Sequence, residues 1–300
     1  MAKKNEEVST VRRAKHGGIL TVIFAILSFL WIAPILIVFL NSFKRKAFIF
    51  THPFSLSCYS ITEGWDKFKA GITRALCGWL NYSNGIRKTN FWECFGTSLF
   101  ITIGSVALII LCCSMCAWYI TRVHTKVTKT IYVLCLFSMI VPFQMVMFTL
   151  SKFANILHLS NPLGIIIVYL GFGAGLAVFM FTGFVKGISL EIEEAAMIDG
   201  CSPLQTFFKV VFPILKPTTV TVAILEAMWV WNDYLLPYLV LSSKYRTIPI
   251  AVQYLKQSHG QIDWGAMMAV LVLAILPIII FYIACQKYII EGVLAGAVKG

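Results

Sequence analysis

Two carboxylates and a tryptophan are spaced to share one face of an apolar segment in the last third of the chain. Glu226, Trp229 and Asp233 follow one another at intervals of three and four residues, which places them on one side of a helix. Ionisable groups at membrane depth usually face a bundle interior or a wet cavity. A solute rich in hydroxyl groups needs donors and acceptors, which makes these three residues candidate contacts together with Asn232 and Gln144. Alternatively, neighbouring helices satisfy both carboxylates.

No motif in the sequence predicts a reaction. The chain has no GxxxxGK[ST] string, so we do not expect it to bind ATP, and its five His residues lack metal-ligand spacing. Cys112, Cys113 and Cys116 lie in one apolar run, where cysteine acts as a small hydrophobic residue. Cys58 and Cys77 can form a disulfide only if their polar stretch lies outside the cell. We predict no catalytic residue, no metal and no cofactor.

Composition requires much of the chain to face lipid. Hydrophobic residues make up 59% of the sequence and charged residues 13%, far from the balance of a soluble domain. Six apolar stretches are long enough to cross a bilayer as helices: 18–41, 94–121, 129–151, 162–186, 218–241 and 266–287. The net charge of +12 comes from basic residues flanking these stretches, which indicates contact with lipid headgroups and not with nucleic acid. The predicted fold is an all-α integral membrane protein.

Prolines and glycines interrupt several of the predicted spans. Pro34, Pro142, Pro237 and Pro277 lie inside them, where neighbouring helices can satisfy the freed carbonyl groups. The fourth span also contains closely spaced glycines, which predict close helix packing or a kink: Gly171, Gly173 and Gly175.

The predicted organisation follows from these spans. We expect an N-terminal segment at 1–17, a first span at 18–41, a long external loop at 42–93, a core of five helices at 94–290 and a tail at 291–300. Lys and Arg are divided almost equally between the two sides, so the charge distribution does not decide the orientation. The basic run that begins at Lys44 even counts against a cytoplasmic N-terminus.

The segment between the fourth and fifth spans predicts two short helices joined at a glycine. Ser189 can cap a first helix that runs from Leu190 to about Asp199, and Gly200 can take the left-handed conformation that ends it. A capping box, formed by Ser202 and Gln205, starts the second helix. Apolar residues then follow at helical spacing and predict one amphipathic stripe: Leu204, Phe207, Phe208 and Val211. On physics alone, the hairpin could simply connect two spans.

The same residues resemble the EAA loop of importer-type ABC permeases. The matching positions, within about 25 residues at fixed spacing, are Glu194, Ala195, Ala196, Asp199, Gly200, Pro213 and Pro217. In that family this cytoplasmic hairpin docks into a groove of the ATPase subunit, which implies that both termini are cytoplasmic. The resemblance assigns the docking contact to Glu194, Ala195, Ala196, Asp199, Gly200, Leu204, Phe207 and Phe208. The family usually has Pro where this chain has Ser189, and both residues can start a helix.

The resemblance extends over most of the chain after about residue 90 and is strongest to the carbohydrate branch, including the smaller permease of the maltose importer. The strings that carry it are Pro142-Phe143-Gln144, Trp231-Asn232-Asp233-Tyr234 and the tail that ends at Gly300. The chain departs from the family pattern at Thr97, at Leu294 and in the length of the loop 42–93.

This resemblance implies a type I ABC importer transmembrane domain in the cell membrane. Its partners would be a second permease subunit, two ATPase subunits, an extracellular sugar-binding protein and membrane lipid. The binding protein would meet Gln257, Ser258, His259, Gly260 and Gln261, while the ATPase dimer would receive Gly296, Lys299 and Gly300 in a slim tail. The remaining alternatives are an importer for a solute other than sugar and a stand-alone secondary transporter.

Overall fold

The structure is a computed structural model that describes residues 17–257 and 262–297. Helices are the regular structure of those residues, and their only extended pairing is an isolated bridge between Lys44 and Leu76. Four helices are long and apolar enough to cross a membrane. They are α1 (Gly17–Ser42), α5 (Phe91–Arg122), α8 (Pro162–Val185) and α15 (Trp264–Ala297).

Two further segments reach that length only as bent pairs. α6 (Lys126–Ile140) and α7 (Phe143–Ile156) meet at 108°. The segment of α10 (Pro203–Thr206), η2 (Phe207–Val211) and α11 (Phe212–Ile214) meets α12 (Lys216–Asn232) at 77°. Counting each bent pair as one crossing gives up to six spans by length and composition, which is the predicted number, although the predicted fifth span, 218–241, begins after α11.

The prolines act differently from one span to another. Pro34 and Pro277 lie inside continuous helices, as predicted. At Pro142, however, the helix expected over 129–151 ends and a new one begins. Val141 is extended (φ −73°, ψ 117°), because a residue before proline avoids the helical region and proline has no N–H to continue the ladder.

The fifth predicted span, 218–241, is also divided. α12 ends at Asn232, and Asp233 is extended before the short helix α13 (Leu235–Val240). The side chain of Asp233 accepts hydrogen bonds from the N–H groups of Leu235 and Leu236, at 3.0 and 3.4 Å. It therefore caps α13 and stabilises the break.

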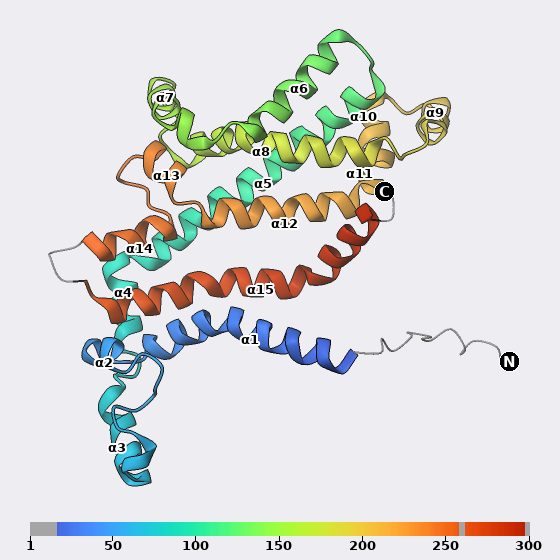
Figure 1. The fold of residues 1–300 in the computed structure, drawn as a ribbon. Helices are drawn as coiled ribbons and strands as arrows, with labels where there is room; N and C mark the ends of the chain where they lie inside the picture. The colour runs from blue at the N-terminus through green and yellow to red at the C-terminus, as the bar shows by residue number, and fades with distance from the viewer. Residues whose placement is uncertain (1–16, 258–261, 298–300) are drawn as a thin grey trace.

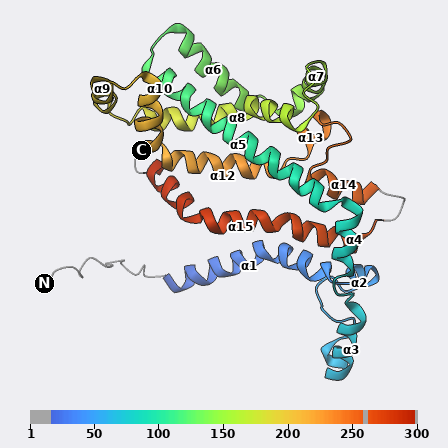
Figure 2. The ribbon, with the colours of Figure 1, turned by 180° about the vertical axis from the view of Figure 1, so that it is seen from behind.

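The bundle has two distinct ends (Figures 1 and 2). At one of them lie α9 (Leu190–Ile198), α10 and α11, together with the start of α1 and the end of α15. We call it the hairpin end. The opposite end, here the far end, carries α2 (Lys46–Thr51), α3 (Trp65–Ala75), α4 (Leu80–Thr89) and α14 (Ile248–Gln257).

The loop expected at 42–93 is largely folded, into α2, the short helix η1 (Ile61–Glu63), α3 and α4. Lys44 is completely buried at its base. Its ammonium donates to Asn41 Oδ1 at 2.8 Å and to the carbonyls of His52 and Pro53 at 2.9 and 3.2 Å, and burial lowers its pKa. These bonds satisfy the charge without a carboxylate.

Two contacts fix the folded loop to the bundle. Asn81 on α4 donates to the carbonyls of Ser42 and Lys44, both at 2.8 Å. Lys88 pairs with Asp263 at the start of α15. Burial raises the pKa of Asp263, but hydrogen bonds from Lys88 and from a backbone N–H outweigh it, so the net pKa is lowered.

The glycines of α8 let two helices approach it closely. A Cβ on Gly173 would lie 2.6 Å from Cδ1 of Ile109 on α5, and one on Gly175 would lie 2.8 Å from the carbonyl oxygen of Cys135 on α6. Gly171 faces open space. Close packing is thus confirmed at two of the three glycines, and α8 is the helix against which α5 and α6 pack.

Candidate functional site

The segment between α8 and α12 forms the predicted hairpin. Ser189 accepts a hydrogen bond from the N–H of Glu191, which starts α9. Gly200 has φ +89°, the left-handed region that suits glycine after a helix. The side chains of Ser202 and Gln205 each bond the other's backbone N–H, which completes the predicted capping box. Local sequence signals therefore determine both helix starts and the turn between them.

The second arm differs from the single amphipathic stripe that the sequence predicts. After α10 the chain makes one π-helical turn, in which the N–H of Phe212 bonds the carbonyl of Phe207. This wider turn changes the register of side chains around the helix. Phe207 and Val211 are consequently buried, whereas Leu204 and Phe208 are 58% and 46% exposed.

A contact that was not predicted from the sequence holds the hairpin to the membrane helices. Glu193 is buried on α9 and accepts from Nη2 and Nε of Arg122, at 2.6 and 2.9 Å. Its other oxygen accepts from Nε1 of Trp118 at 2.9 Å, and Arg122 also donates to the carbonyl of Ile188 at 3.0 Å. Phe207 packs against the Trp118 ring with centroids 5.4 Å apart. The last turns of α5 therefore bind both arms of the hairpin.

The outer surface of the hairpin is unusually apolar. Ile198 is 85% exposed, and five more large apolar side chains are at least 45% exposed on the same unit: Leu190, Ile192, Met197, Leu204 and Phe208. Of the predicted docking residues, Phe207 is buried and Ala196 half-buried, while the exposed ones are Glu194, Ala195, Asp199, Gly200, Leu204 and Phe208. Contiguous exposed apolar surface rimmed by polar residues is typical of a protein interaction site.

The candidate solute contacts on α12 converge on one part of α8. Glu226 is 2% exposed and lies against Gly173. The Trp229 ring meets the Tyr169 ring edge to face, with centroids 5.4 Å apart. Asp233 accepts a hydrogen bond from the Tyr169 hydroxyl at 3.0 Å. The three residues thus share a face, as predicted, and Tyr169 is a partner that the sequence did not identify.

Two other candidate contacts are exposed near this position. Gln144 lies in the first turn of α7, where its neighbour Phe143 packs on Phe172 of α8 with centroids 5.5 Å apart. Asn232 is exposed at the end of α12 and donates to the carbonyl of Met228 at 2.7 Å. With Trp229, which is 40% exposed, these residues are open to a solute, whereas Glu226 is not.

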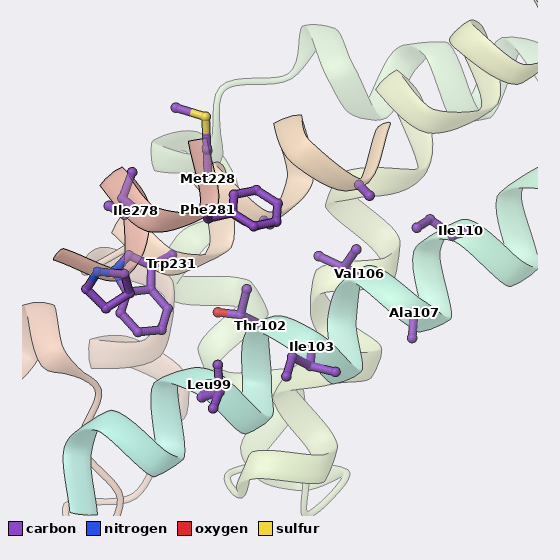
Figure 3. A pocket seen from close by; sticks show the side chains of 13 residues that line it. Leu99, Thr102, Ile103, Val106, Ala107, Ile110, Met228, Trp231, Ile278 and Phe281 are labelled. Atoms are coloured by element: carbon purple, nitrogen blue, oxygen red, sulfur yellow. The ribbon is translucent and has the colours of Figure 1, made fainter. Parts of the chain in front are cut away.

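The opposite side of α12 borders an apolar cavity of about 520 Å³ between α5, α12 and α15 (Figure 3). Ile103 and Val106 of α5 and Phe281 of α15 contribute to its walls. Its lining contains few polar groups, among them the hydroxyl of Thr102 and the indole of Trp231, whose Nε1 already donates to Ala274 O at 3.3 Å. A polyhydroxylated solute would find few hydrogen-bond partners there.

Some of the predicted site residues fall outside the described part. They are Ser258, His259, Gly260, Gln261, Lys299 and Gly300. Gln257 is the last residue of α14. Gly296 lies in α15, which continues as helix to Ala297 through most of the expected slim tail.

The described part of the chain contains neither a disulfide nor a group of metal-ligating side chains. All nine cysteines are free, so Cys58 and Cys77 are not joined. In 17–257 and 262–297 no three His, Cys, Asp or Glu side chains are grouped as metal ligands.

Comparison with known proteins agrees with this architecture of a multi-pass membrane protein. Residues 109–294 match the family described as binding-protein-dependent transport system inner membrane component. The chain belongs to this family, so it is a non-catalytic membrane subunit of a transport system, and the predicted resemblance is confirmed.

Two curated relatives match nearly the whole chain. It is 37% identical over 282 residues to the probable starch degradation products transport system permease protein AmyC of Thermoanaerobacterium thermosulfurigenes, covering 94% of this chain and 96% of that protein. It is 32% identical over 288 residues to the multiple sugar-binding transport system permease protein MsmG of Streptococcus mutans, covering 94% of each.

A solved structure has the same fold. A chain of a bacterial ABC transporter involved in the import of the acidic polysaccharide alginate superposes with a TM-score of 0.70 at 22% identity, covering 94% of this chain and 99% of that one.

Proposed function

We propose that this chain is the permease subunit of an ATP-driven sugar importer, forming half of the translocation pathway with a second permease. The observation that carries the proposal is the α9–α11 hairpin, whose apolar side chains are exposed and whose base is fixed to α5 through Glu193. The relatives named for starch products and for multiple sugars support sugar as the solute class.

In this proposal the hairpin docks on an ATPase subunit. Glu194, Ala195, Ala196, Asp199 and Gly200, with Leu204 and Phe208, form the contact. Phe207 supports the contact from below, because it is buried against Trp118. A displacement of the hairpin by the ATPase would be transmitted to α5, since Arg122 bonds both Glu193 and the carbonyl of Ile188, between α8 and α9.

Variants of the exposed hairpin test the docking. Gly200→Pro should remove the left-handed turn, and Glu194→Lys should make the contact repulsive. Both should abolish uptake and co-purification of the ATPase while the chain still inserts. The same charge reversal at the exposed Asp66, at the far end, should leave both unchanged. Normal ATPase binding and uptake in both hairpin variants would contradict the docking, and uptake without any ATPase would favour a stand-alone transporter.

The solute pathway would follow the exposed side chains near the middle of α8. We assign solute contact to Gln144, Trp229 and Asn232, while Asp233 and Glu226 position α12 and α13 against α8. Trp229→Ala should reduce uptake of sugars more than complex assembly. Uptake of a panel of radiolabelled solutes would decide between a sugar and another solute. Only the transported solute should accumulate and stimulate ATP hydrolysis by the intact complex.

The two ends of the bundle would face opposite compartments. The hairpin end, where α1 begins and α15 ends, would be cytoplasmic, which a membrane-impermeant thiol reagent can test in a background without native cysteines. A cysteine replacing His158, in the turn between α7 and α8, should react from outside, and one replacing Ser202 should not. The reverse pattern would refute cytoplasmic docking.

The far end would then receive the binding protein. The five predicted contact residues are Gln257, Ser258, His259, Gly260 and Gln261, and they begin with the last residue of α14, at that end. Replacing these five residues by a Gly-Ser linker should reduce sugar uptake without affecting assembly. Unchanged uptake would show that the segment only connects α14 to α15.

The C-terminal segment would contact the ATPase dimer through Gly296, in α15, and through Lys299 and Gly300, which follow it in the sequence. Deletion of the last six residues should change the ATP hydrolysis rate of the assembled complex at normal yield. If hydrolysis and uptake both match those of the intact protein, the tail has no role in coupling.

A further inference from the structure

A second cavity, polar and basic, lies beside the hairpin between the ends of three helices. It has a volume of about 520 Å³ and is bounded by the last turn of α5, the first turns of α6 and the end of α8. Thr121, Thr128 and Thr182 are its buried polar residues, and Lys126, Lys129 and Lys186 are exposed at its edge. None of these residues takes part in the docking or solute contacts described above.

One hydroxyl in this cavity has no partner. Thr182 is 2% exposed, and its Oγ1 makes no hydrogen bond to any residue in the described part of the chain. The hydroxyls of Thr121 and Thr128 differ, because they donate to the carbonyls of Ala117 and Val123, both at 2.7 Å. A buried hydroxyl without a partner costs free energy, so a bound acceptor would stabilise it.

The charges around the cavity favour an anion. Among residues 17–257 and 262–297, no carboxylate pairs with Lys126, Lys129 or Lys186. The ion pair nearest in sequence joins Arg122 to Glu193, so this carboxylate already has a partner other than the three lysines. The N-terminus of α6, a helix of 15 residues, also lies at the cavity and adds its positive dipole end.

The surroundings favour a ligand that is anionic at one end and apolar at the other. The cavity lies where the apolar segments of α5 and α8 end and α6 begins, so we expect it at the depth of the headgroup layer. Beyond it α6 exposes large apolar side chains that acyl chains can cover: Val127, Val133, Leu134, Phe137 and Ile140. Free phosphate would use the lysines but leave this face uncovered.

We infer that the cavity binds the phosphate group of an anionic phospholipid. Lys129 and Lys186 bind the phosphate from the edge, the Thr182 hydroxyl donates to a phosphate oxygen, and the acyl chains lie along α6. Basic pockets between membrane helices are suited to such headgroups. Each lysine close to the headgroup changes the binding affinity about fivefold. The site does not depend on which solute the protein transports.

The test measures lipid retention by the purified full-length chain. The protein is taken from nanodiscs that contain phosphatidylglycerol and phosphatidylcholine, and bound lipids are counted by native mass spectrometry. Phosphatidylglycerol should be retained in preference, and Lys129→Gln with Lys186→Gln should reduce its retention roughly 25-fold. Lys216→Gln, an exposed lysine outside the cavity, is the matched control and should have no effect.

A second variant keeps the test valid if the double variant does not fold. Thr182→Val removes only the unpartnered hydroxyl, so it should preserve folding and still weaken phosphatidylglycerol retention. Equal retention in Thr182→Val and the unmodified chain would overturn the proposal. So would displacement of the lipid by excess inorganic phosphate, which would identify a free-anion site. Loss of ATPase co-purification with unchanged lipid retention would assign the cavity to a protein interface and equally overturn it.

Discussion

Replacing Glu193 by Gln should release the hairpin from the membrane helices while preserving side-chain shape. The amide oxygen can still accept from Trp118, but Arg122 loses its counter-charge. Removing one partner of a buried ion pair costs about 3–5 kcal/mol. The Arg122 side chain is 19% exposed and keeps its bond to Ile188, so we expect about 2–3 kcal/mol.

Hydrogen–deuterium exchange of the purified chain measures this loss directly. If the hairpin opens locally, 2–3 kcal/mol corresponds to roughly 30- to 150-fold faster exchange of the α9 amides. Amides of α8 should exchange as before, because that helix keeps its packing against α5 and α6. In the assembled transporter, ATP hydrolysis should continue while uptake falls, since hairpin movement would no longer reach α5.

The controls separate the ion pair from a general effect on α9. Glu191→Gln changes an exposed carboxylate two residues away and should alter exchange less than twofold. In a double-mutant cycle, Arg122→Met should cost little once Glu193 is already Gln. If α9 exchange in Glu193→Gln matches the Glu191→Gln control, the ion pair does not hold the hairpin and the argument for coupling through α5 is wrong.

Three further predictions concern packing and charge. Gly173→Val should cost about 1–3 kcal/mol in thermal stability, because its Cβ would clash with α5, whereas Gly171→Val, which faces open space, should cost far less. Tyr169→Phe removes the hydrogen bond to the carboxylate that begins α13, so uptake should fall with complex yield unchanged; reduced yield would indicate a purely structural role. Lys88→Gln should lower stability by less than about 1 kcal/mol at pH 7, and the difference should shrink as the pH falls below about 4, because Asp263 has a lowered pKa and then becomes protonated. A difference that persists at low pH would show that packing, not charge, accounts for it.

Local signals in the sequence predicted the hairpin well. Its caps and its turn depend on contacts between residues close together in sequence. The structure has each at the predicted position: Ser189, Gly200, and the pair of Ser202 and Gln205. The π-helical turn was not predictable in the same way. It buries Phe207 beneath Trp118, a residue 89 positions earlier, so tertiary packing and not helical spacing decides which residues of the stripe face outward.

The missed features all join residues far apart in sequence. Glu193 and Arg122 are separated by 71 positions, and Tyr169 and Asp233 by 64. Spacing alone indicated that Asp233 needs a partner at membrane depth but could not identify Tyr169. Proline positions were ambiguous for the same reason. Pro277 lies within a continuous helix, whereas a helix ends just before Pro142. Nothing in either local sequence separates the two outcomes.

The break at Pro142 has a consequence for how the chain enters the membrane during synthesis. α6 and α7 have 15 and 14 residues, which makes each about 21–23 Å long, short of the roughly 30 Å of hydrocarbon. Neither half can therefore be accepted by the insertion machinery as a complete span. α6 rests on α8, where Gly175 admits it, and α8 is translated later (Figure 1). The third crossing can therefore complete its packing only after α8 has been synthesised.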